Sequence, residues 1–214
     1  MTATPQGGKA IVVSCCTFII ICSIAAHAGP RGSVQPVAEH HPSTSATECG
    51  YRADRPLEIG CGTGDNAIWL SQQNFHVLGI DTSEIAIEKA KEKASKANTK
   101  CAFLVSDILT SHIEGASFGF VFDRGCFHTM GSDEERKSFA ENVNRHLEED
   151  GLWLSLLGNA DEKRDGPGPP QRTAREIVYA VEPYFEILSL VSGSFGSNRP
   201  DPPRAWVCLM RKRR

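Results

Sequence analysis

The fold of this chain is decided by the stretch Pro56–Asp65, which reads PLEIGCGTGD. Its apolar part, Leu57–Ile59, predicts a short buried strand, and the segment Asn66–Leu70 predicts the first turns of a helix. Three glycines at alternate positions separate the two: Gly60, Gly62 and Gly64. Because glycine has no Cβ and tolerates unusual backbone angles, such a loop can bring bare N–H groups against a ligand. The stretch therefore predicts a loop that binds a nucleotide cofactor.

The spacing of these glycines argues against a dinucleotide. A dinucleotide loop has the pattern G-x-G-x-x-G and directs the start of a helix at a pyrophosphate. Here the pattern is G-x-G-x-G, and Glu58 stands two positions before the first glycine. A carboxylate at that place adds little to an anion site, whereas it favours a cationic ligand. We therefore expect the cofactor to carry a positive charge.

Two more acids follow the next two predicted strands. The segment Phe75–Asp81 ends in an acid about 20 residues after Gly60, where a doubly wound fold places the carboxylate that binds ribose hydroxyls. The segment Ala102–Ser106 is followed by Asp107. Any one strand-end Asp is usually a helix cap or a turn residue. Three acids at three successive strands behind the glycine loop instead favour a common cofactor pocket.

The pattern E-x-G-x-G-x-G over residues 58–64 resembles motif I of the class I S-adenosylmethionine-dependent methyltransferases. This resemblance implies that S-adenosylmethionine is the cofactor, with Asp81 at the ribose hydroxyls and Asp107 near the adenine amino group. The cofactor-binding residues that it implies are Glu58, Gly60, Gly62, Gly64, Asp81, Thr82, Asp107, Ile108 and Asp123.

Strands and helices alternate after the glycine loop, which predicts a mostly parallel sheet with helices on both faces. Six further strands are expected over residues 75–81, 102–106, 118–123, 152–157, 185–191 and 205–210. The fold class is α/β, a single doubly wound, seven-stranded sheet. This count fits the Rossmann-like methyltransferase fold, which implies that the final strand runs antiparallel to the others.

Three longer helices are expected between these strands, over residues 83–97, from residue 132 onward, and over residues 173–181. The second begins with a capping box at Ser132–Glu135 and buries Phe139, Val143 and Leu147. The pair Asp150-Gly151 is expected to stop it, because glycine commonly ends helices.

The composition predicts four segments. Residues 1–28 contain an apolar run over residues 11–26, which predicts a targeting or anchor segment and membrane association. Residues 29–54 are rich in Pro, Ser, Thr, Ala and His and predict a disordered linker. Residues 55–210 are the predicted methyltransferase domain, and residues 211–214 a basic tail. A signal anchor, a cleaved presequence and a gene-model extension all fit the first segment.

The overall charge and the cysteines exclude several classes of partner. The chain of 214 residues has 23 Lys and Arg against 26 Asp and Glu, a net charge of −3, which makes no case for nucleic acid. Its eight cysteines show no C-x-x-C spacing, so neither a metal site nor a disulfide framework is expected. Their scatter is typical of a reducing compartment, so the domain is expected to face the cytoplasm. We expect a monomer whose partner is a small-molecule methyl acceptor.

The turn after the fourth strand, residues 122–129, reads FDRGCFHT. It is expected to face the reacting methyl group, because ligands of such sheets bind at the carboxyl ends of the strands. Together with Gly166–Pro170 and Arg175–Ile177, it resembles the thiopurine and thiol S-methyltransferase branch of the family. This resemblance implies methyl transfer to a thiol or another chalcogen nucleophile. Within the turn, Phe127 is expected to pack along the cofactor.

The candidate catalytic residues are Arg124 and His128. A guanidinium could stabilise a thiolate or hold an acidic group of the substrate, although a structural pair with Asp123 is the alternative. The imidazole could accept a proton from a neutral nucleophile, with cofactor lining or packing as its alternative. Cys126 is a poor candidate for a nucleophile, because methyl transfer needs no covalent enzyme intermediate.

Two other functions stay open at this point. One is an O- or N-methyltransferase of the same fold, which would differ in the product that it forms. The other is a catalytically degenerate paralogue that binds the cofactor weakly. Members of the family usually have an ordered, aromatic segment before motif I that closes over the cofactor, whereas residues 29–54 of this chain contain only Tyr51 as an aromatic.

Overall fold

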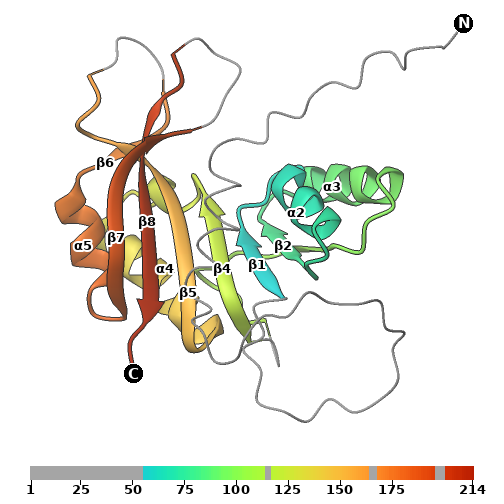
Figure 1. The fold of residues 1–214 in the computed structure, drawn as a ribbon, viewed down its shortest axis with the longest axis horizontal. Coiled ribbons are helices and arrows are strands. Elements are labelled where there is room, and N and C mark those ends of the chain that lie inside the picture. Colours follow the sequence, from blue (N-terminus) through green and yellow to red (C-terminus); the bar gives the residue numbers. More distant parts are fainter. Residues whose placement is uncertain (1–54, 114–116, 164–167, 196–200) are drawn as a thin grey trace, which may run out of the picture.

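A computed structural model of the chain describes residues 55–113, 117–163, 168–195 and 201–214. Its strands form one mixed sheet with helices packed on it (Figure 1). In chain order the elements are β1 (Pro56–Ile59), α2 (Asp65–Gln72), β2 (Leu78–Asp81), α3 (Glu84–Lys96), β3 (Ala102–Val105), β4 (Phe118–Arg124), the 3-10 turn η1 (Phe127–Thr129), α4 (Asp133–His146), β5 (Leu147–Asn159), β6 (Gln171–Arg172), α5 (Ala174–Val181), β7 (Phe185–Ser194) and β8 (Arg204–Lys212).

The strand order is β3-β2-β1-β4-β5-β8-β7, and the two-residue β6, which was not predicted, pairs with the end of β5. Neighbouring strands from β3 to β5 are parallel, whereas β8 is antiparallel to both β5 and β7. In Figure 1 the arrow of β8 points against that of β4. The predicted doubly wound sheet with an antiparallel last strand is therefore confirmed. Because β1 lies between β2 and β4, the chain reverses direction across the sheet there, and ligands bind beyond the strand ends at such a point.

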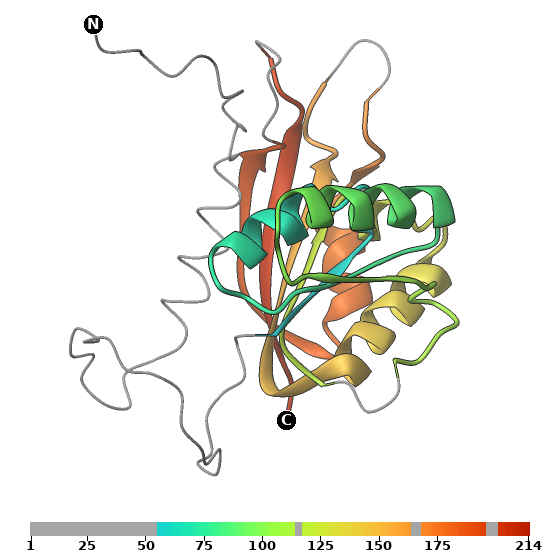
Figure 2. The ribbon, with the colours of Figure 1, turned by 90° about the vertical axis from the view of Figure 1, so that its right-hand side faces the viewer.

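Two apolar clusters attach the helices to opposite faces of the sheet. Helices α4 and α5 lie together on one side of the strands (Figure 2), where Phe139 and Ile177 share a buried cluster with Trp153 of β5. Helices α2 and α3 belong to the second cluster, in which Ile87 is buried with Phe103 of β3. Each large side chain buried in this way contributes roughly 1.5–3 kcal/mol. The clusters hold the carboxyl ends of β1, β2 and β4 in a fixed arrangement.

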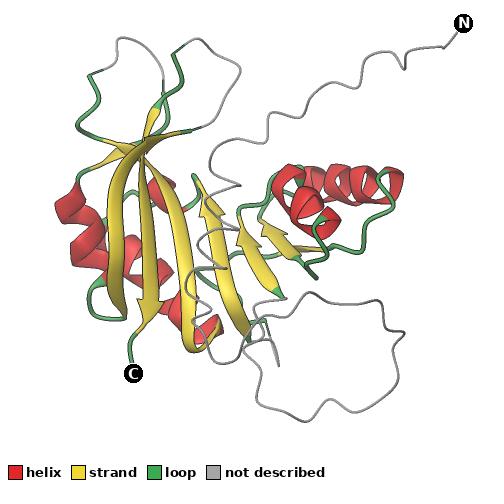
Figure 3. Ribbon diagram, in the orientation of Figure 1, coloured by secondary structure: helices red, strands yellow, loops and turns green. Residues whose placement is uncertain are grey.

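Helix α4 begins as predicted but ends earlier. Its capping box is present, since Ser132 Oγ accepts from the N–H of Glu135 and the Glu135 carboxylate accepts from the N–H of Ser132. The helix stops at His146, and Leu147 already has strand angles, so β5 follows without a loop (Figure 3). The prediction that Asp150-Gly151 ends the helix was therefore wrong.

The pair Asp150-Gly151 instead forms an irregularity inside β5. Asp150 has a positive φ of 60°, and a Cβ on Gly151 would stand 2.8 Å from the carbonyl oxygen of Glu148. The register between β4 and β5 shifts at the same place. A glycine is thus required by a close backbone approach within a strand, a role that sequence alone does not separate from a helix stop.

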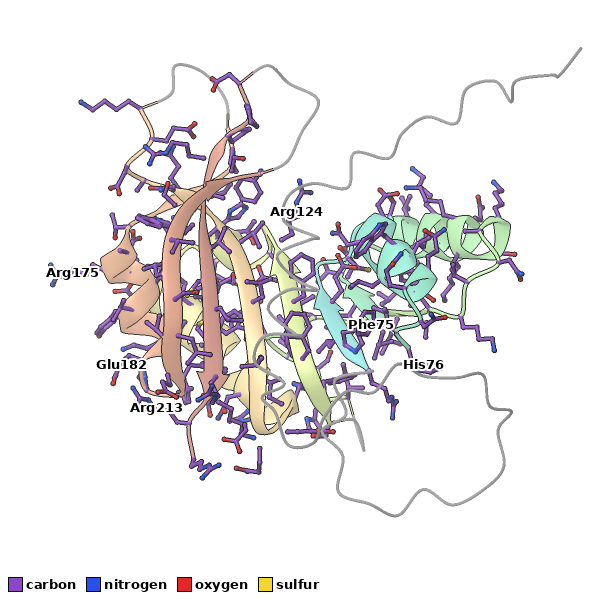
Figure 4. All side chains as sticks on the ribbon, viewed as in Figure 1. Phe75, His76, Arg124, Arg175, Glu182 and Arg213 are labelled. Atoms are coloured by element: carbon purple, nitrogen blue, oxygen red, sulfur yellow. The ribbon has the colours of Figure 1, made fainter. Side chains whose placement is uncertain are left out.

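The basic C-terminal residues are partly inside the sheet. Strand β8 continues to Lys212, which lies in the segment predicted as a tail. Arg213 pairs with Glu182 at 3.0 Å, as the labelled side chains in Figure 4 show, and Arg214 pairs with Asp150 at 2.8 Å. Exposed pairs of this kind contribute about 0–1 kcal/mol each, so they position the end of the chain more than they stabilise it.

The predictions for residues 1–28 and 29–54, including the apolar run, lie outside the described residues, as do residues 166 and 167 of the proline-rich loop. Among the helices that the structure does describe, none combines the length and the apolar character needed to cross a membrane.

Candidate functional site

The loop after β1 requires glycine for two separate reasons. Gly60, Gly62 and Gly64 have positive φ angles of 68°, 53° and 81°, a region that costs other residues roughly 1–2 kcal/mol. In addition, a Cβ on Gly60 would stand 2.7 Å from the Cβ of Cys126, and one on Gly64 would stand 2.8 Å from the ring of Phe103. The loop backbone therefore packs directly on β3 and on the turn after β4, and α2 begins immediately behind it.

Asp81, the last residue of β2, is tied to this loop. Its Oδ2 accepts a hydrogen bond from the N–H of Gly62 at 2.8 Å, and its Oδ1 accepts one from the N–H of Ser83 at 2.9 Å. The first bond holds the glycine loop against the end of β2. The second joins Asp81 to Ser83, the N-cap residue of α3. Since each carboxylate oxygen can accept more than one hydrogen bond, Asp81 could also bind a pair of ligand hydroxyls.

A cavity of about 140 Å³ opens between the glycine loop and the ends of β2 and β3. Five of the residues predicted to bind the cofactor line it: Gly60, Asp81, Thr82, Asp107 and Ile108. Asp107 is held in place because its Oδ1 accepts from the N–H of Leu109 at 2.9 Å. The structure thus brings the strand-end acids of β2 and β3 to one hollow.

The opposite wall consists of Cys126, Thr129 and Met130, which sequence reasoning did not assign to the cofactor site. They lie in and next to η1, directly after β4. Their place beside the glycine loop follows from the pairing of β4 with β1. The doubly wound strand order, which the sequence predicts, is the signal that could have found them.

Two arginines support this wall from outside the cavity. The guanidinium of Arg172 donates to the carbonyl oxygen of Met130 at 2.8 Å, and that of Arg136 donates to the same oxygen at 2.9 Å. Charge-assisted bonds from two elements, β6 and α4, leave the backbone at Met130 little freedom. The wall is therefore a rigid part of the fold.

Glu58 lies beneath the glycine loop and does not line the cavity. Its side chain is buried, Oε1 accepts from Asn66 Nδ2 at 2.8 Å, and Oε2 has no hydrogen-bond partner among the described residues. Burial raises the pKa of this carboxyl group to about 8, so its neutral form predominates at pH 7. In the ionised form the buried Oε2 would lack a donor, which is costly, and a ligand ammonium group could supply it.

Asp123 has a different environment from the one predicted. It is fully buried, Oδ1 accepts from the N–H groups of Cys126 and Phe127 at 3.2 and 3.0 Å, and Oδ2 accepts from Trp153 Nε1 at 3.0 Å. Burial raises its pKa to about 6 against the opposing effect of these bonds. The geometry does not support the predicted cofactor contact of Asp123; its carboxylate instead holds the turn after β4.

Phe127, expected to pack along the cofactor, points into the core. Its side chain is completely buried, and its ring centroid lies 5.2 Å from those of both Phe139 and Trp153. The expectation was wrong because the 3-10 turn directs Cys126 and Thr129 toward the cavity and Phe127 into the core.

The turn predicted to face the reacting methyl group begins at the end of β4. Figure 4 shows Arg124 projecting past this strand end, with its guanidinium 5.8 Å from the ring centroid of Phe195. His128 contacts the same ring edge-on, with centroids 5.7 Å apart. The imidazole Nδ1 accepts a hydrogen bond from the N–H of Gly158 at 2.9 Å. The structure therefore gathers both predicted catalytic residues around an aromatic ring that the sequence did not single out.

The thiols near the site are poor nucleophiles. Burial raises the pKa of Cys61 to about 12 and raises that of Cys126 still further, so neither forms a thiolate at neutral pH. Among the described residues there is also no group of three side chains suited to a metal ion. The protonated thiols favour a reaction that takes place between two bound ligands.

Larger cavities lie away from the predicted cofactor site. One of about 430 Å³ is lined by residues 71, 72, 74–76 and 97–100, at the amino ends of β2 and β3. The labels of Phe75 and His76 in Figure 4 mark this end of the strands, far from Arg124. Size alone does not identify the site, because parallel sheets of this order bind ligands at the carboxyl ends.

Comparison with known proteins agrees with this geometry. Residues 57–151 match a family model described as a methyltransferase domain. A solved S-adenosylmethionine-dependent methyltransferase from Methanosarcina mazei superposes with a TM-score of 0.62 at 20% identity, over 74% of this chain and 92% of that one. The chain contains a methyltransferase domain. The methyltransferase is also 28% identical over 162 residues to a probable thiol methyltransferase of Arabidopsis thaliana, covering 75% of this chain and 69% of that protein.

A second relative of this methyltransferase is thiocyanate methyltransferase 1 of Brassica oleracea, 28% identical over 159 residues. That match covers 74% of this chain and 65% of the relative. S-adenosylmethionine is the cofactor of this enzyme, and the site fits it. The unpartnered Oε2 of Glu58 suits an ammonium group, and Asp81 suits a ribose diol. When bound, the cofactor supplies a methyl group on a sulfonium centre.

Proposed function

We propose that this methyltransferase transfers a methyl group to a small sulfur nucleophile, a thiol or a related chalcogen anion. The observation that carries the proposal is the composition of the acceptor side. The guanidinium at the end of β4 and the neutral imidazole of the turn that forms one wall of the cofactor cavity both lie at the ring of Phe195. An anionic nucleophile and a sulfonium react to neutral products, so a mainly apolar surrounding with one nearby cation favours the reaction.

The names of the two plant relatives support a sulfur acceptor, since one is a thiol methyltransferase and the other a thiocyanate methyltransferase. The identity of 28% leaves the acceptor itself as a proposal. Membrane association through residues 11–26 and a monomeric state stay predictions from the sequence.

We assign the cofactor contacts as part of the same proposal. Asp81 and Thr82 hold the ribose, and Asp107 with Ile108 lies at the adenine. The glycine loop and Glu58 accommodate the amino-acid part, for which the unpartnered Oε2 is the supporting observation. Arg124 acts on the acceptor and not on the cofactor.

The test is binding followed by turnover. Isothermal titration calorimetry with S-adenosylmethionine should show one site, and a panel of thiols, thiocyanate, alcohols and amines should then give methylated product only with sulfur acceptors, as read by mass spectrometry. Product from alcohols or amines alone would replace the proposal by an O- or N-methyltransferase. Absence of binding would indicate the degenerate paralogue.

A further inference from the structure

We propose that His128 is a fixed hydrogen-bond donor at the acceptor site, which selects nucleophiles that arrive already deprotonated, and that it is not a general base. This inference rests on the proposed methyl transfer to a sulfur nucleophile. It is carried by the hydrogen bond to Nδ1 and by the place of Nε2 over Gly125.

The proton position on the imidazole follows from its partner. The N–H of Gly158 lies 2.9 Å from Nδ1, and a backbone amide can only donate. Nδ1 must therefore accept, and the single proton of the neutral ring is on Nε2. A second proton could be added only at Nδ1, where it would break this bond and place two N–H groups against each other. The ring thus has no lone pair available for a substrate proton.

Burial and a neighbouring cation both keep His128 neutral. Burial, together with Arg172 of β6, lowers the pKa of the imidazole to about 4. Arg124 of β4 is a cation at the ring of Phe195, which His128 also contacts, and the carboxylate of Asp123 is buried with both oxygens hydrogen-bonded. Cys126 keeps its proton because burial raises its pKa. The neutral ring therefore persists through the physiological pH range.

The Nε2 edge of the buried imidazole lies against Gly125, where only a glycine leaves room for it. Gly125 has a positive φ of 84°, and a Cβ at this position would stand 3.1 Å from Nε2 of His128. None of the described residues accepts a hydrogen bond from Nε2. Phe195 contacts both the imidazole and the guanidinium of Arg124. An acceptor at this ring would meet an N–H donor and a cation together.

These groups define the class of acceptor. In the transfer, a lone pair of the nucleophile forms the new bond to carbon while the bond from carbon to the sulfonium sulfur breaks, and its electron pair stays on that sulfur. No proton moves when the nucleophile is an anion, whereas an alcohol or an ammonium group must lose one. Since His128 has no free lone pair and Asp123 is completely buried with both oxygens hydrogen-bonded, soft anions such as thiolates, hydrosulfide and thiocyanate are the fitting substrates.

The first test compares the pH dependence of kcat/KM for two acceptors. Thiocyanate is an anion throughout, so its profile at saturating S-adenosylmethionine should be flat over about pH 5 to 9. A cysteine derivative, whose thiol has a pKa of about 8.5, should react about tenfold faster for each pH unit up to that value. A rise of kcat/KM at about pH 6.5 that is common to both acceptors and absent from His128 variants would overturn the inference.

The second test uses three substitutions of His128. His128→Ala should lower kcat/KM about 10- to 100-fold, because a hydrogen bond to a charged group is lost. His128→Gln places an amide N–H near the position of Nε2, whereas His128→Asn places an oxygen near that of Nδ1 and keeps the bond from Gly158. A kcat/KM that is higher in His128→Gln than in His128→Asn supports the donor role. Full recovery with Asn would show that His128 is only structural.

Nitrogen NMR of isotope-labelled imidazole gives a readout that does not depend on turnover. The proposal expects a protonated Nε2 and an unprotonated Nδ1 in the enzyme with and without S-adenosylmethionine. A proton on Nδ1 in an active enzyme would overturn the His128 inference alone. Cofactor binding without turnover of any sulfur acceptor would overturn the proposed function and, with it, the selection of anions.

Discussion

The N–H of Gly62 donates a hydrogen bond of 2.8 Å to Oδ2 of Asp81. This bond joins the glycine loop after β1 to the end of β2, so the two parts of the predicted cofactor site hold each other in position. The carboxylate that is proposed to bind the ribose also sets the position of the loop that covers it. Changes at either residue should therefore alter cofactor affinity.

Asp81→Ala should weaken the binding of S-adenosylmethionine by about 1–3 kcal/mol, because charged hydrogen bonds to the ligand and to the loop are lost. Titration calorimetry measures this change. Glu88→Ala, which removes an exposed carboxylate of α3, is the matched control and should leave the affinity unchanged. Equal affinities of wild type and Asp81→Ala would remove the ribose assignment.

Cofactor affinity should rise with pH through the pKa of Glu58, which is about 8. The carboxyl group is mainly protonated below that value, and pairing with a ligand ammonium group requires its ionised form, so binding releases a proton. Calorimetry in two buffers of different ionisation enthalpy detects the release. Glu58→Gln should abolish it, and an unchanged release in that variant would contradict the assignment.

The same carboxyl group should lower the stability of the ligand-free protein at high pH. Its pKa in the folded chain, about 8, exceeds the ordinary value of 4.5. Its contribution is therefore fully present below pH 4.5 and is lost as the pH rises through 8. Thermal unfolding from acid to mildly alkaline pH should show this loss in the wild type and a smaller one in Glu58→Gln.

Gly60→Ala should destabilise the protein more than Gly62→Ala does. Both changes force alanine to a positive φ, at a cost of roughly 1–2 kcal/mol. Only at Gly60 does the new Cβ also collide with Cys126, at 2.7 Å, whereas nothing lies within 4 Å of a Cβ at Gly62. Urea unfolding measures the free energy of unfolding of both variants. Equal decreases would show that the turn after β4 moves to accommodate the new Cβ at no cost.

Arg124→Ala should preserve the affinity for S-adenosylmethionine and reduce turnover, because the guanidinium lies at Phe195 and not in the wall of the cofactor cavity. Arg124→Lys keeps the charge without the planar group and should recover part of the rate. Calorimetry and steady-state kinetics on the same preparations separate the two effects. Equal loss of binding and turnover would make Arg124 a structural residue.

The cofactor half of the site could be predicted from the sequence because its signals are local. A strand, alternating glycines and a helix follow one another within residues 56–72, Asp81 ends β2, and Asp107 lies two residues after β3. What the sequence could not show is which acids are open to a ligand. Asp81 faces the cavity, whereas Asp123, also at the end of a strand, is buried by Trp153 from the neighbouring β5.

The acceptor half depends on contacts between distant parts of the chain. Gly158 of β5, Arg172 of β6 and Phe195 after β7 meet the turn after β4 only because the strands are arranged in a sheet. The sequence by itself determined the doubly wound order and the cofactor class, since hydrophobic periodicity and glycine spacing act over a few residues. Only the tertiary structure decided that His128 is a donor, because the proton position on its ring is set by an amide 30 residues away.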